Sequence, residues 1–432
     1  MGTIANLPNP KYKRVVIGGG GFGGLKLARL LYQSGYQVLV IDKNNYHQFQ
    51  PLLYQVATAG LEPSAISFPF RKLFQNQERM HFRIAELLNI EPENNKIITS
   101  IGKIEYDFFV IAAGLTTNYF GNENIRKYAY SMKSVSDALL IRNTILQNYE
   151  SALNESSISE KEGHMNVVVV GGGPTGVEMA GALAEMKKYI LPKDYPELDF
   201  TLMNIYLFEA SPKLLNVMSE NSSAKSKEYL EKLGVIVKTN TFVKDYDGKK
   251  VLLSDGTTHS TYTMVWAAGV MPNSIQGLHA GCYGKGKRIL VNELNQVKGY
   301  ENIFALGDIA EMHTNDYPNG HPQVAPVAIQ QAQNLAGNLI RLKNNKQLKE
   351  FRYVDKGSLA TIGRNLAVAD LPYLKTQGFF AWVLWLFVHI MMLIGVKNKI
   401  FVMMDWAWNY FFSDQALRLM IKPSSKNNSE NK

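Results

Sequence analysis

The stretches VVIGGGGFGG at 15–24 and VVVVGGGPTG at 167–176 decide the fold of this chain. In each, an unbroken run of β-branched residues leads into a glycine-rich turn, and apolar residues at helical spacing follow. An unbroken apolar run is typical of a parallel strand buried on both faces. A G-x-G-x-x-G turn between a strand and a helix is typical of a phosphate-binding turn. The repeated pattern predicts an α/β fold with two Rossmann-like dinucleotide-binding domains.

The first turn offers three glycines and a carboxylate at the spacing of a dinucleotide site. We assign the tight turn out of the strand to Gly18, the close approach to a pyrophosphate to Gly20, and the close helix packing to Gly23. Asp42 ends the next predicted strand, about 20 residues later, where a carboxylate can hold a ribose diol.

The second turn repeats this arrangement with Gly171, Gly173 and Gly176, and Glu209 ends the strand that follows. A carboxylate at this position accepts hydrogen bonds from both ribose hydroxyls and repels a 2′-phosphate, which favours NADH over NADPH. One glycine motif alone would be weak evidence, but two with matching acidic residues predict two nucleotide sites. A tightly held flavin and an exchanging hydride donor fit this pair best.

Composition excludes several other kinds of site. The chain has 432 residues, a formal net charge of +9 and one cysteine, Cys282. A single thiol excludes an internal disulfide, a redox dithiol and a multi-cysteine metal site. His47 and His321 have no ligand spacing, so we predict no metal. The basic charge suits an anionic membrane surface or nucleic acid, but no basic aromatic repeat or helix-turn-helix pattern supports nucleic acid.

The C-terminal part differs in character from the rest of the chain. Residues 376–396 carry no fixed charge and could span a bilayer by length alone. Trp382, Trp385 and His389 recur at helical spacing, however, and such side chains favour the headgroup level. Together with the aromatic segment 400–412 and its basic flanks, they predict amphipathic helices lying in the membrane interface. A helix pair buried in a dimer interface is the alternative.

Nearly the whole chain resembles one family of flavoproteins. Besides the two turns and the tail, the resemblance rests on QPLLYQVATAGL at 50–61, YDFFVIAAG at 106–114, VWAAGV at 265–270, IFALGDIA at 303–310, VAIQQAQNLAGNL at 327–339 and GSLATIGRNLAVADL at 357–371. These motifs are similar to those of type II NADH:quinone dehydrogenases, which are single-subunit, non-proton-pumping members of the two-dinucleotide-domain flavoprotein reductase superfamily.

The resemblance implies electron transfer from NADH through FAD to a membrane quinone, menaquinone or ubiquinone, in a respiratory chain. It also implies a monotopic enzyme on the cytoplasmic face of the cell membrane, in contact with the lipid bilayer surface, and a homodimer through the C-terminal region. The expected domains are the FAD-binding domain at 11–162 and 271–372, the NADH-binding domain at 163–270, membrane-anchoring amphipathic helices at 373–422 and a disordered polar tail at 423–432.

The resemblance further assigns residues to the two cofactors. The first glycine turn would hold FAD and the second NADH. Asp308, in the Gly307-Asp308 turn, would bind the ribityl chain or the pyrophosphate end of the flavin. Gly114 and Gly269 would mark the ends of strands that pass near the cofactors.

Two catalytic residues are expected from the same resemblance. Glu178 would lie by the nicotinamide and flavin and serve proton transfer to the quinone, although it could simply be a helix-start carboxylate. Gln330 would be catalytic and would contact the quinone together with Gln331, although it could be a surface or capping glutamine. The family often has a glutamine where this chain has Pro326, so Gln323 is the expected substitute contact.

Two other functions remain open from the sequence. One is an FAD-dependent NADH reductase with a protein electron acceptor, for which the apolar tail would serve no purpose. The other is a non-catalytic NADH-sensing flavoprotein, which fast quinone-dependent NADH oxidation would exclude.

Overall fold

The fold is described from a computed structural model, which describes residues 7–8, 11–414 and 417–420. The chain divides into two compact units, each assembled from three segments. Unit 1 contains Met1–Gln48, Phe68–Thr116 and Val270–Lys356, and unit 2 contains Phe49–Ser67, Thr117–Gly269 and Gly357–Lys432. The predicted polar tail at 423–432 lies outside the described residues.

The two compact units do not coincide with the predicted domains. Residues 49–67, 117–162 and 357–372 were expected in the FAD-binding domain but belong to unit 2. The cause is packing: helix α5 (Val135–Leu153) lies against strand β18 (Thr263–Trp266) of the unit 2 sheet, and β23 (Ser358–Gly363) lies against helix α7 (Pro174–Tyr189). The segment expected as a separate anchor also belongs to unit 2.

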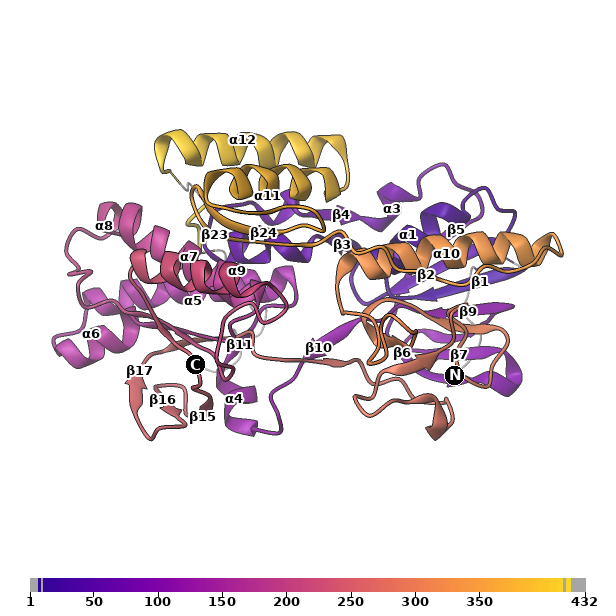
Figure 1. Ribbon diagram of the computed structural model, residues 1–432, viewed down its shortest axis with the longest axis horizontal. Helices are drawn as coiled ribbons and strands as arrows, with labels where there is room; N and C mark the ends of the chain where they lie inside the picture. Colours follow the sequence, from indigo (N-terminus) through magenta and orange to yellow (C-terminus); the bar gives the residue numbers. More distant parts are fainter. Residues whose placement is uncertain (1–6, 9–10, 415–416, 421–432) are drawn as a thin grey trace, which may run out of the picture. The chain divides into compact units, whose positions relative to one another are not determined.

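Unit 1 is built on a five-stranded parallel sheet that leads into the first glycine turn. The strand order is β21 (Ile303–Ala305), β9 (Phe108–Ile111), β1 (Arg14–Gly18), β2 (Gln37–Asp42) and β5 (Met80–Ile84). Every residue of β1 is buried, as the apolar run predicts. Helices α1 (Phe22–Leu31) and α10 (Ala325–Lys343) pack side by side, and α1 lies against β1 and β2 (Figure 1).

A small antiparallel sheet takes part in the rest of the unit 1 core. It consists of β6 (Leu87–Glu91), β7 (Lys96–Thr99) and β8 (Gly102–Glu105). Ile97 and Ile104 of this sheet share one hydrophobic cluster with Val16 and Leu39 of the parallel sheet. The remaining elements of unit 1 are β3 (Tyr46–Gln48), α3 (Phe70–Leu73), η3 (Pro92–Asn94), β19 (Val270–Pro272), η4 (Ala280–Cys282), β20 (Ile289–Val291), η5 (Gly307–Ile309) and β22 (Ala310–Met312).

Unit 2 repeats the Rossmann-like plan, which confirms the predicted fold class. Its parallel sheet has the order β11 (Tyr130–Ser131), β18, β12 (Val167–Val170), β13 (Ile205–Phe208) and β14 (Val235–Lys238). Helix α7 packs on the three strands that follow β18 in this order, and α5 packs on β11 and β18. The other elements are η1 (Gln50–Leu52), α2 (Leu53–Ala57), η2 (Pro63–Ala65), α4 (Glu123–Tyr128), α6 (Ile158–Met165), α8 (Leu191–Asp194), α9 (Glu220–Lys232) and the antiparallel strands β15 (Val243–Tyr246), β16 (Lys250–Leu253) and β17 (Thr258–Ser260).

The connecting segments add short elements to the two units. Ser134 is the N-cap of α5, and its side chain accepts from the Asp137 N–H in a capping box. Residues 154–163 contribute most of α6, which packs on α5. Residues 63–73 form η2, β4 (Ser67–Pro69) and α3. Strand β10 (Leu115–Thr117) follows β9 after three residues.

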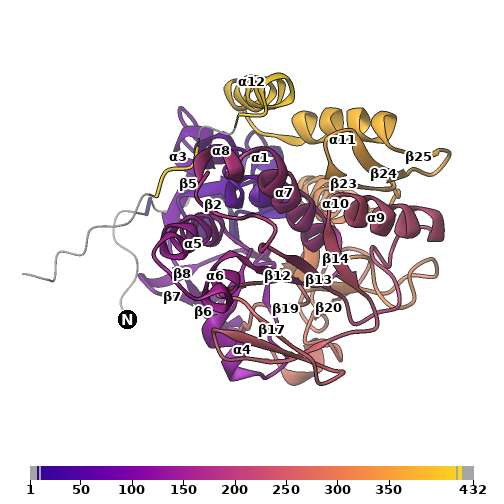
Figure 2. The ribbon, with the colours of Figure 1, turned by 90° about the vertical axis from the view of Figure 1, so that its left-hand side faces the viewer.

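The C-terminal part of unit 2 consists of a small sheet and two aromatic helices. Strands β23, β24 (Leu366–Asp370) and β25 (Lys375–Gln377) are antiparallel, and α11 (Phe379–Met392) packs on β24 (Figure 2). Helix α12 (Val396–Phe412) follows after Gly395, whose φ of +84° marks the break. None of the helices within the described ranges is long and apolar enough to cross a membrane.

The orientation of α11 corrects the predicted membrane-facing side. Trp385 is only 1% exposed, and its ring stacks on His389 with centroids 4.0 Å apart. Burial lowers the pKa of His389 to about 4. The exposed apolar side chains of α11 lie on another face and include Phe380 and Phe387. Tryptophan spacing alone could not distinguish a lipid-facing stripe from one that packs against the protein.

Candidate active site

The structure shifts the roles in the first glycine turn by one residue. Gly19 has a φ of +114°, and a Cβ there would lie 2.3 Å from the carbonyl oxygen of Ala112. A Cβ on Gly24 would lie 1.9 Å from the carbonyl oxygen of Gly19, so only glycine permits the close contact between turn and helix. Gly21 is the N-cap of α1, with open space where a Cβ would stand. The positive φ and the close contact with the helix therefore fall on Gly19 and Gly24 instead of the predicted Gly18 and Gly23, and the N-cap beside open space is Gly21 instead of Gly20.

The second turn has the same geometry in the predicted register. Gly171 has a φ of +109°, and a Cβ on Gly176 would lie 1.8 Å from the Gly171 carbonyl oxygen. Gly173 is the N-cap of α7 and, like Gly21, faces open space.

The acidic residues at the strand ends bond directly to the turns. The N–H of Gly20 donates to Asp42 Oδ2 at 2.7 Å, and the N–H of Gly172 donates to a carboxylate oxygen of Glu209. Burial raises the pKa of Asp42, while the N–H donors of Asn44 and Gly20 oppose this change. Each carboxylate is thus fixed beside the turn where a nucleotide ribose would be held.

Both turns fit a dinucleotide pyrophosphate. Helices α1 and α7 start at Gly21 and Gly173, and neither N-cap supplies a side-chain acceptor to the first-turn N–H groups. Such groups, together with the positive end of the helix dipole, favour a bound phosphate. The open space at both N-caps leaves room for it. Each unit therefore has one turn whose geometry fits a dinucleotide pyrophosphate.

The predicted glutamines of unit 1 are engaged with the backbone. The buried Gln331 side chain accepts from the Gly307 N–H at 2.7 Å, and Gln323 donates to the Asp308 carbonyl oxygen at 3.3 Å. These bonds hold the turn that carries Asp308. Gln330 donates to the Val354 carbonyl oxygen at 2.9 Å and accepts from its N–H at 3.0 Å. All three amides therefore have structural partners in unit 1.

Replacing Gln331 by leucine is expected to leave the Gly307 N–H buried without an acceptor. An unsatisfied buried donor costs about 1–3 kcal/mol. The variant should therefore have a lower melting temperature and lose FAD more readily, because the Asp308 turn loses its support. Thermal unfolding followed by both circular dichroism and flavin fluorescence checks this. Gln331→Glu, which retains the acceptor oxygen, should bind FAD better than the leucine variant.

The glycines predicted at the strand ends have different environments. Gly114 has a φ of +64°, a conformation that favours glycine, and its Cβ position is open. Gly269 has no positive φ, but a Cβ there would lie 2.7 Å from the Phe120 ring. Gly269 thus allows close packing, whereas Gly114 allows a turn beside open space.

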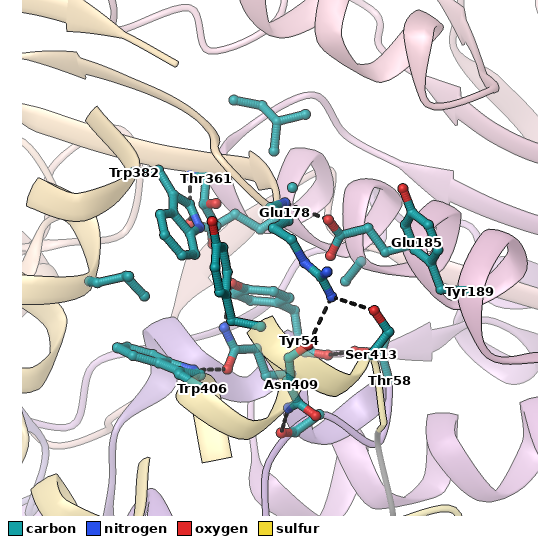
Figure 3. Close-up of a pocket in the computed structure, with 18 of the residues that line it drawn as sticks. Tyr54, Thr58, Glu178, Glu185, Tyr189, Thr361, Trp382, Trp406, Asn409 and Ser413 are labelled. Carbon is teal, nitrogen blue, oxygen red and sulfur yellow. Dashed lines mark hydrogen bonds between the residues drawn. The ribbon is translucent and has the colours of Figure 1, made fainter. Parts of the chain in front are cut away.

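A cavity of about 120 Å³ lies entirely within unit 2 and contains Glu178 (Figure 3). Its walls come from residues 54–60, α7, β23 and the two C-terminal helices. Glu178 is 7% exposed, and burial raises its pKa to about 8. The nearest backbone donor, the Thr361 N–H, lies 3.5 Å away and is a weak partner. A carboxyl in this environment is protonated at neutral pH and can donate a proton.

Aromatic donors surround this carboxyl. The Trp385 indole N–H lies near Glu178 and favours its charged form, but within the described structure that N–H is buried without a hydrogen-bond partner. The Tyr54 hydroxyl accepts from Gln55 at 2.8 Å, and the Gln55 oxygen accepts from the Trp406 indole at 2.7 Å. The cavity therefore offers N–H and O–H groups to a ligand or water that accepts hydrogen bonds.

A second carboxylate and an arginine line the same cavity. The Glu185 carboxylate accepts from the backbone N–H of Arg364. The Arg364 guanidinium donates to the Asn409 carbonyl oxygen at 2.8 Å and to Ser413 Oγ at 3.0 Å. Arg364, which directly follows β23, thus connects this strand to the end of α12.

Sequence reasoning did not assign Tyr54, Glu185 or Trp385 to a site. Tyr54 lies in the motif QPLLYQVATAGL, and Glu185 lies at the end of VVVVGGGPTGVEMAGALAE. Both motifs contributed to the family resemblance, but neither residue was given a role. A signal was available in the pair Glu178 and Glu185, because residues seven apart lie on the same face of a helix.

Comparisons with known proteins show the family of this chain. Residues 12–332 match the family model for pyridine nucleotide-disulphide oxidoreductases, and residues 356–415 match the NDH2 C-terminal domain. A type II NADH:quinone oxidoreductase of Mycobacterium tuberculosis, Ndh, is 33% identical over 92% of this chain and 88% of its own length. A second one from that organism, NdhA, is 34% identical over 92% and 87%. The NADH complex of NDH2 from Plasmodium falciparum has the same fold, with a TM-score of 0.87, 24% identity, and coverage of 95% of this chain and 100% of that one. The chain therefore belongs to the pyridine nucleotide-disulphide oxidoreductase family and, within it, to the type II NADH:quinone oxidoreductases.

Proposed function

We propose that this protein oxidises NADH and reduces a membrane quinone through FAD, without pumping protons. The observation that carries the proposal is the combination of two dinucleotide turns, one in each unit, with a buried and protonated Glu178 beside a donor-lined cavity. Two-electron reduction of a quinone forms two O–H bonds, so the protein must supply protons where water is excluded.

The chain's own residues bind and orient the nucleotides. In unit 1, the turn at Gly19, Gly21 and Gly24, with Asp42 and Asp308, would hold FAD. In unit 2, the turn at Gly171, Gly173 and Gly176, with Glu209, would hold NADH. When bound, FAD would provide the redox chemistry, which is to accept a hydride and pass on two electrons.

Glu178 acts in this proposal as the proton donor to the quinone. Its carboxyl is neutral below about pH 8, and ionisation in this buried site is unfavourable until a proton acceptor is present. Gln330 remains a proposed catalytic and quinone-contacting residue, with Gln331 and Gln323 as further quinone contacts. Their present backbone bonds would have to be shared or exchanged when a quinone binds.

The C-terminal helices would attach the enzyme to the cytoplasmic face of the membrane as a monotopic protein. Phe380 and Phe387 on α11 are 76% and 62% exposed, and Phe411 on α12 is 76% exposed. Lys397 and Lys399 at the start of α12 supply basic charge for anionic lipid. The same apolar surface could be shared with a second copy, so a homodimer through this region is part of the proposal.

Replacing Phe380, Phe387 and Phe411 together by serine is expected to release the protein from anionic lipid vesicles. Each exposed phenyl ring that enters the membrane contributes about 1.5–3 kcal/mol, so the triple change should lower vesicle binding by more than 100-fold. Co-sedimentation with phosphatidylglycerol vesicles measures this. Ile158→Ser on α6, also an exposed apolar side chain, should bind as the wild type does. Unchanged binding of the triple variant would contradict attachment through these helices.

The proposed function is tested by NADH oxidation with purified, detergent-solubilised protein, with and without a short-chain quinone, together with an absorbance spectrum. A flavin spectrum and strong stimulation by quinone are expected. Flavin that NADH bleaches but quinone does not restore would instead favour a protein electron acceptor. Absence of catalytic turnover with any acceptor would favour an NADH sensor.

A further inference from the structure

The reaction requires a proton from solvent in every turnover. NADH and quinone give NAD⁺ and quinol only if one proton is added to the transferred hydride. Glu178 can donate that proton once, and it must then regain one from outside. Glu178 is only 7% exposed, so its contact with bulk water is small.

Glu185 is placed to connect Glu178 with solvent. It follows Glu178 by seven residues on α7, so the two side chains lie on one helix face about 10 Å apart along the axis. Both line the same cavity, but Glu185 is partly exposed, whereas Glu178 is buried. Figure 3 shows both carboxylates and Tyr54 around this space.

Tyr54 lines the same cavity as both carboxylates. Burial raises the pKa of Tyr54 well above its usual value, and the charges of Glu178 and of Glu185 raise it further. The phenol therefore remains protonated and can pass a proton by accepting one and donating another. The other charged groups near the Glu185 carboxyl are Arg364 and Lys188.

The cavity has the size and the polar groups for a short chain of water molecules. A buried water needs about 10–15 Å³ of such space, so a cavity of about 120 Å³ has room for several. Trp385, a side chain 1% exposed, lines this space, and its indole N–H acts on Glu178 without a hydrogen bond of good geometry among the described residues. Buried donors normally have a well-aligned partner, and an ordered water between these two groups would supply one.

We propose that Glu185 is the proton-entry residue of this enzyme and returns protons from solvent to Glu178 through cavity water and the Tyr54 hydroxyl. In each transfer an O–H bond breaks at Glu185, another forms at Glu178, and no electrons move. Glu185 then regains its proton from bulk water. The inference rests on the proposed function, because it supplies the proton that quinone reduction consumes.

Glu185→Gln tests this role, because the amide oxygen can still accept from the Arg364 N–H while the titratable proton is removed. With holoenzyme, saturating NADH and a short-chain benzoquinone, kcat should fall about tenfold. The decrease should grow towards high pH, and the solvent deuterium isotope effect should increase. The KM for NADH and the rate at which NADH bleaches the flavin absorbance should not change. Glu185→Asp should restore part of kcat, and added imidazole should restore part of it in the glutamine variant.

The control is Glu197→Gln, the same change at an exposed carboxylate outside the cavity, which should behave as the wild type does. Wild-type kcat in Glu185→Gln at every pH would overturn the inference while leaving quinone reduction intact. An equal decrease in the rate of flavin bleaching would also overturn it, because the residue would then be structural. A wild-type protein that does not reduce quinone would instead contradict the proposed function itself.

Discussion

Glutamine in place of Glu178 is expected to lower kcat for quinone reduction by about 100-fold, the range typical of losing a general acid. The amide has nearly the same shape but carries no transferable proton. FAD should remain bound, because the glycine turn that would hold its pyrophosphate lies in unit 1 and Glu178 lies in unit 2. Steady-state kinetics with a short-chain quinone, alongside anaerobic bleaching of the flavin by NADH, separates proton supply from NADH binding. Wild-type kcat would contradict the proposed role.

The pH dependence provides an independent check on Glu178. Wild-type activity should decline above about pH 8 as the carboxyl loses its proton, and the residual activity of the glutamine variant should not follow this titration. The effect of pH on folding stability has the opposite sign from that of a salt-bridged carboxylate, because stability here decreases as pH rises. The folded pKa is raised from 4.5, so the stabilising contribution of the neutral form is complete below about pH 4.5 and is lost as pH rises to about 8. The loss is about 1.4 kcal/mol for each pH unit in that interval.

Glutamine at 178 does not titrate, so the variant should lose less stability than the wild type between about pH 5 and about pH 8. Chemical denaturation at the two pH values measures this difference. Lower activity combined with equal or greater stability at high pH would exclude unfolding as the cause of the kinetic defect.

The fold class was predictable from sequence because the two glycine turns are strong local patterns. Each follows a strand buried on both faces, and that context is visible in the run of valines. The register of the first turn was not predictable, because four consecutive glycines at 18–21 are chemically identical. Which of these glycines forms the tight turn depends on backbone conformation. Gly19 adopts a positive φ, and Gly24 packs against the carbonyl oxygen of Gly19. The second turn has only three consecutive glycines and leaves less ambiguity.

The cavity around Glu178 could not be predicted from the sequence, for a different reason. Its walls are residues distant in sequence, from Tyr54 through Glu185 to Ser413, that meet only after β23 packs on α7. Helical spacing grouped Trp382, Trp385 and His389 correctly but could not say whether that face meets lipid or protein. Glu178 was found by family resemblance, whereas its raised pKa follows from burial that only the fold reveals.

Alanine at Gly176 is expected to abolish NADH oxidation by disrupting the second turn. The new Cβ would lie 1.8 Å from the Gly171 carbonyl oxygen, which belongs to the backbone and cannot move aside as a flexible side chain can. Helix α7 would have to shift away from β12, and overpacking of this kind costs about 1–3 kcal/mol or more. Thermal unfolding should show a lower transition, and NADH should no longer bleach the flavin at concentrations that saturate the wild type.

Gly173→Ala is the matched control variant, because it should affect NADH binding without affecting the stability of the turn. Gly173 has a φ of −72° and open space around its Cβ position, so alanine should leave the melting temperature nearly unchanged. The added methyl group would occupy the open space where the pyrophosphate of NADH is proposed to bind. The KM for NADH should therefore rise by about tenfold or more, while FAD stays bound. If Gly173→Ala binds NADH normally, the phosphates do not lie at this turn. If Gly176→Ala retains normal stability and activity, the close contact between turn and helix is not required.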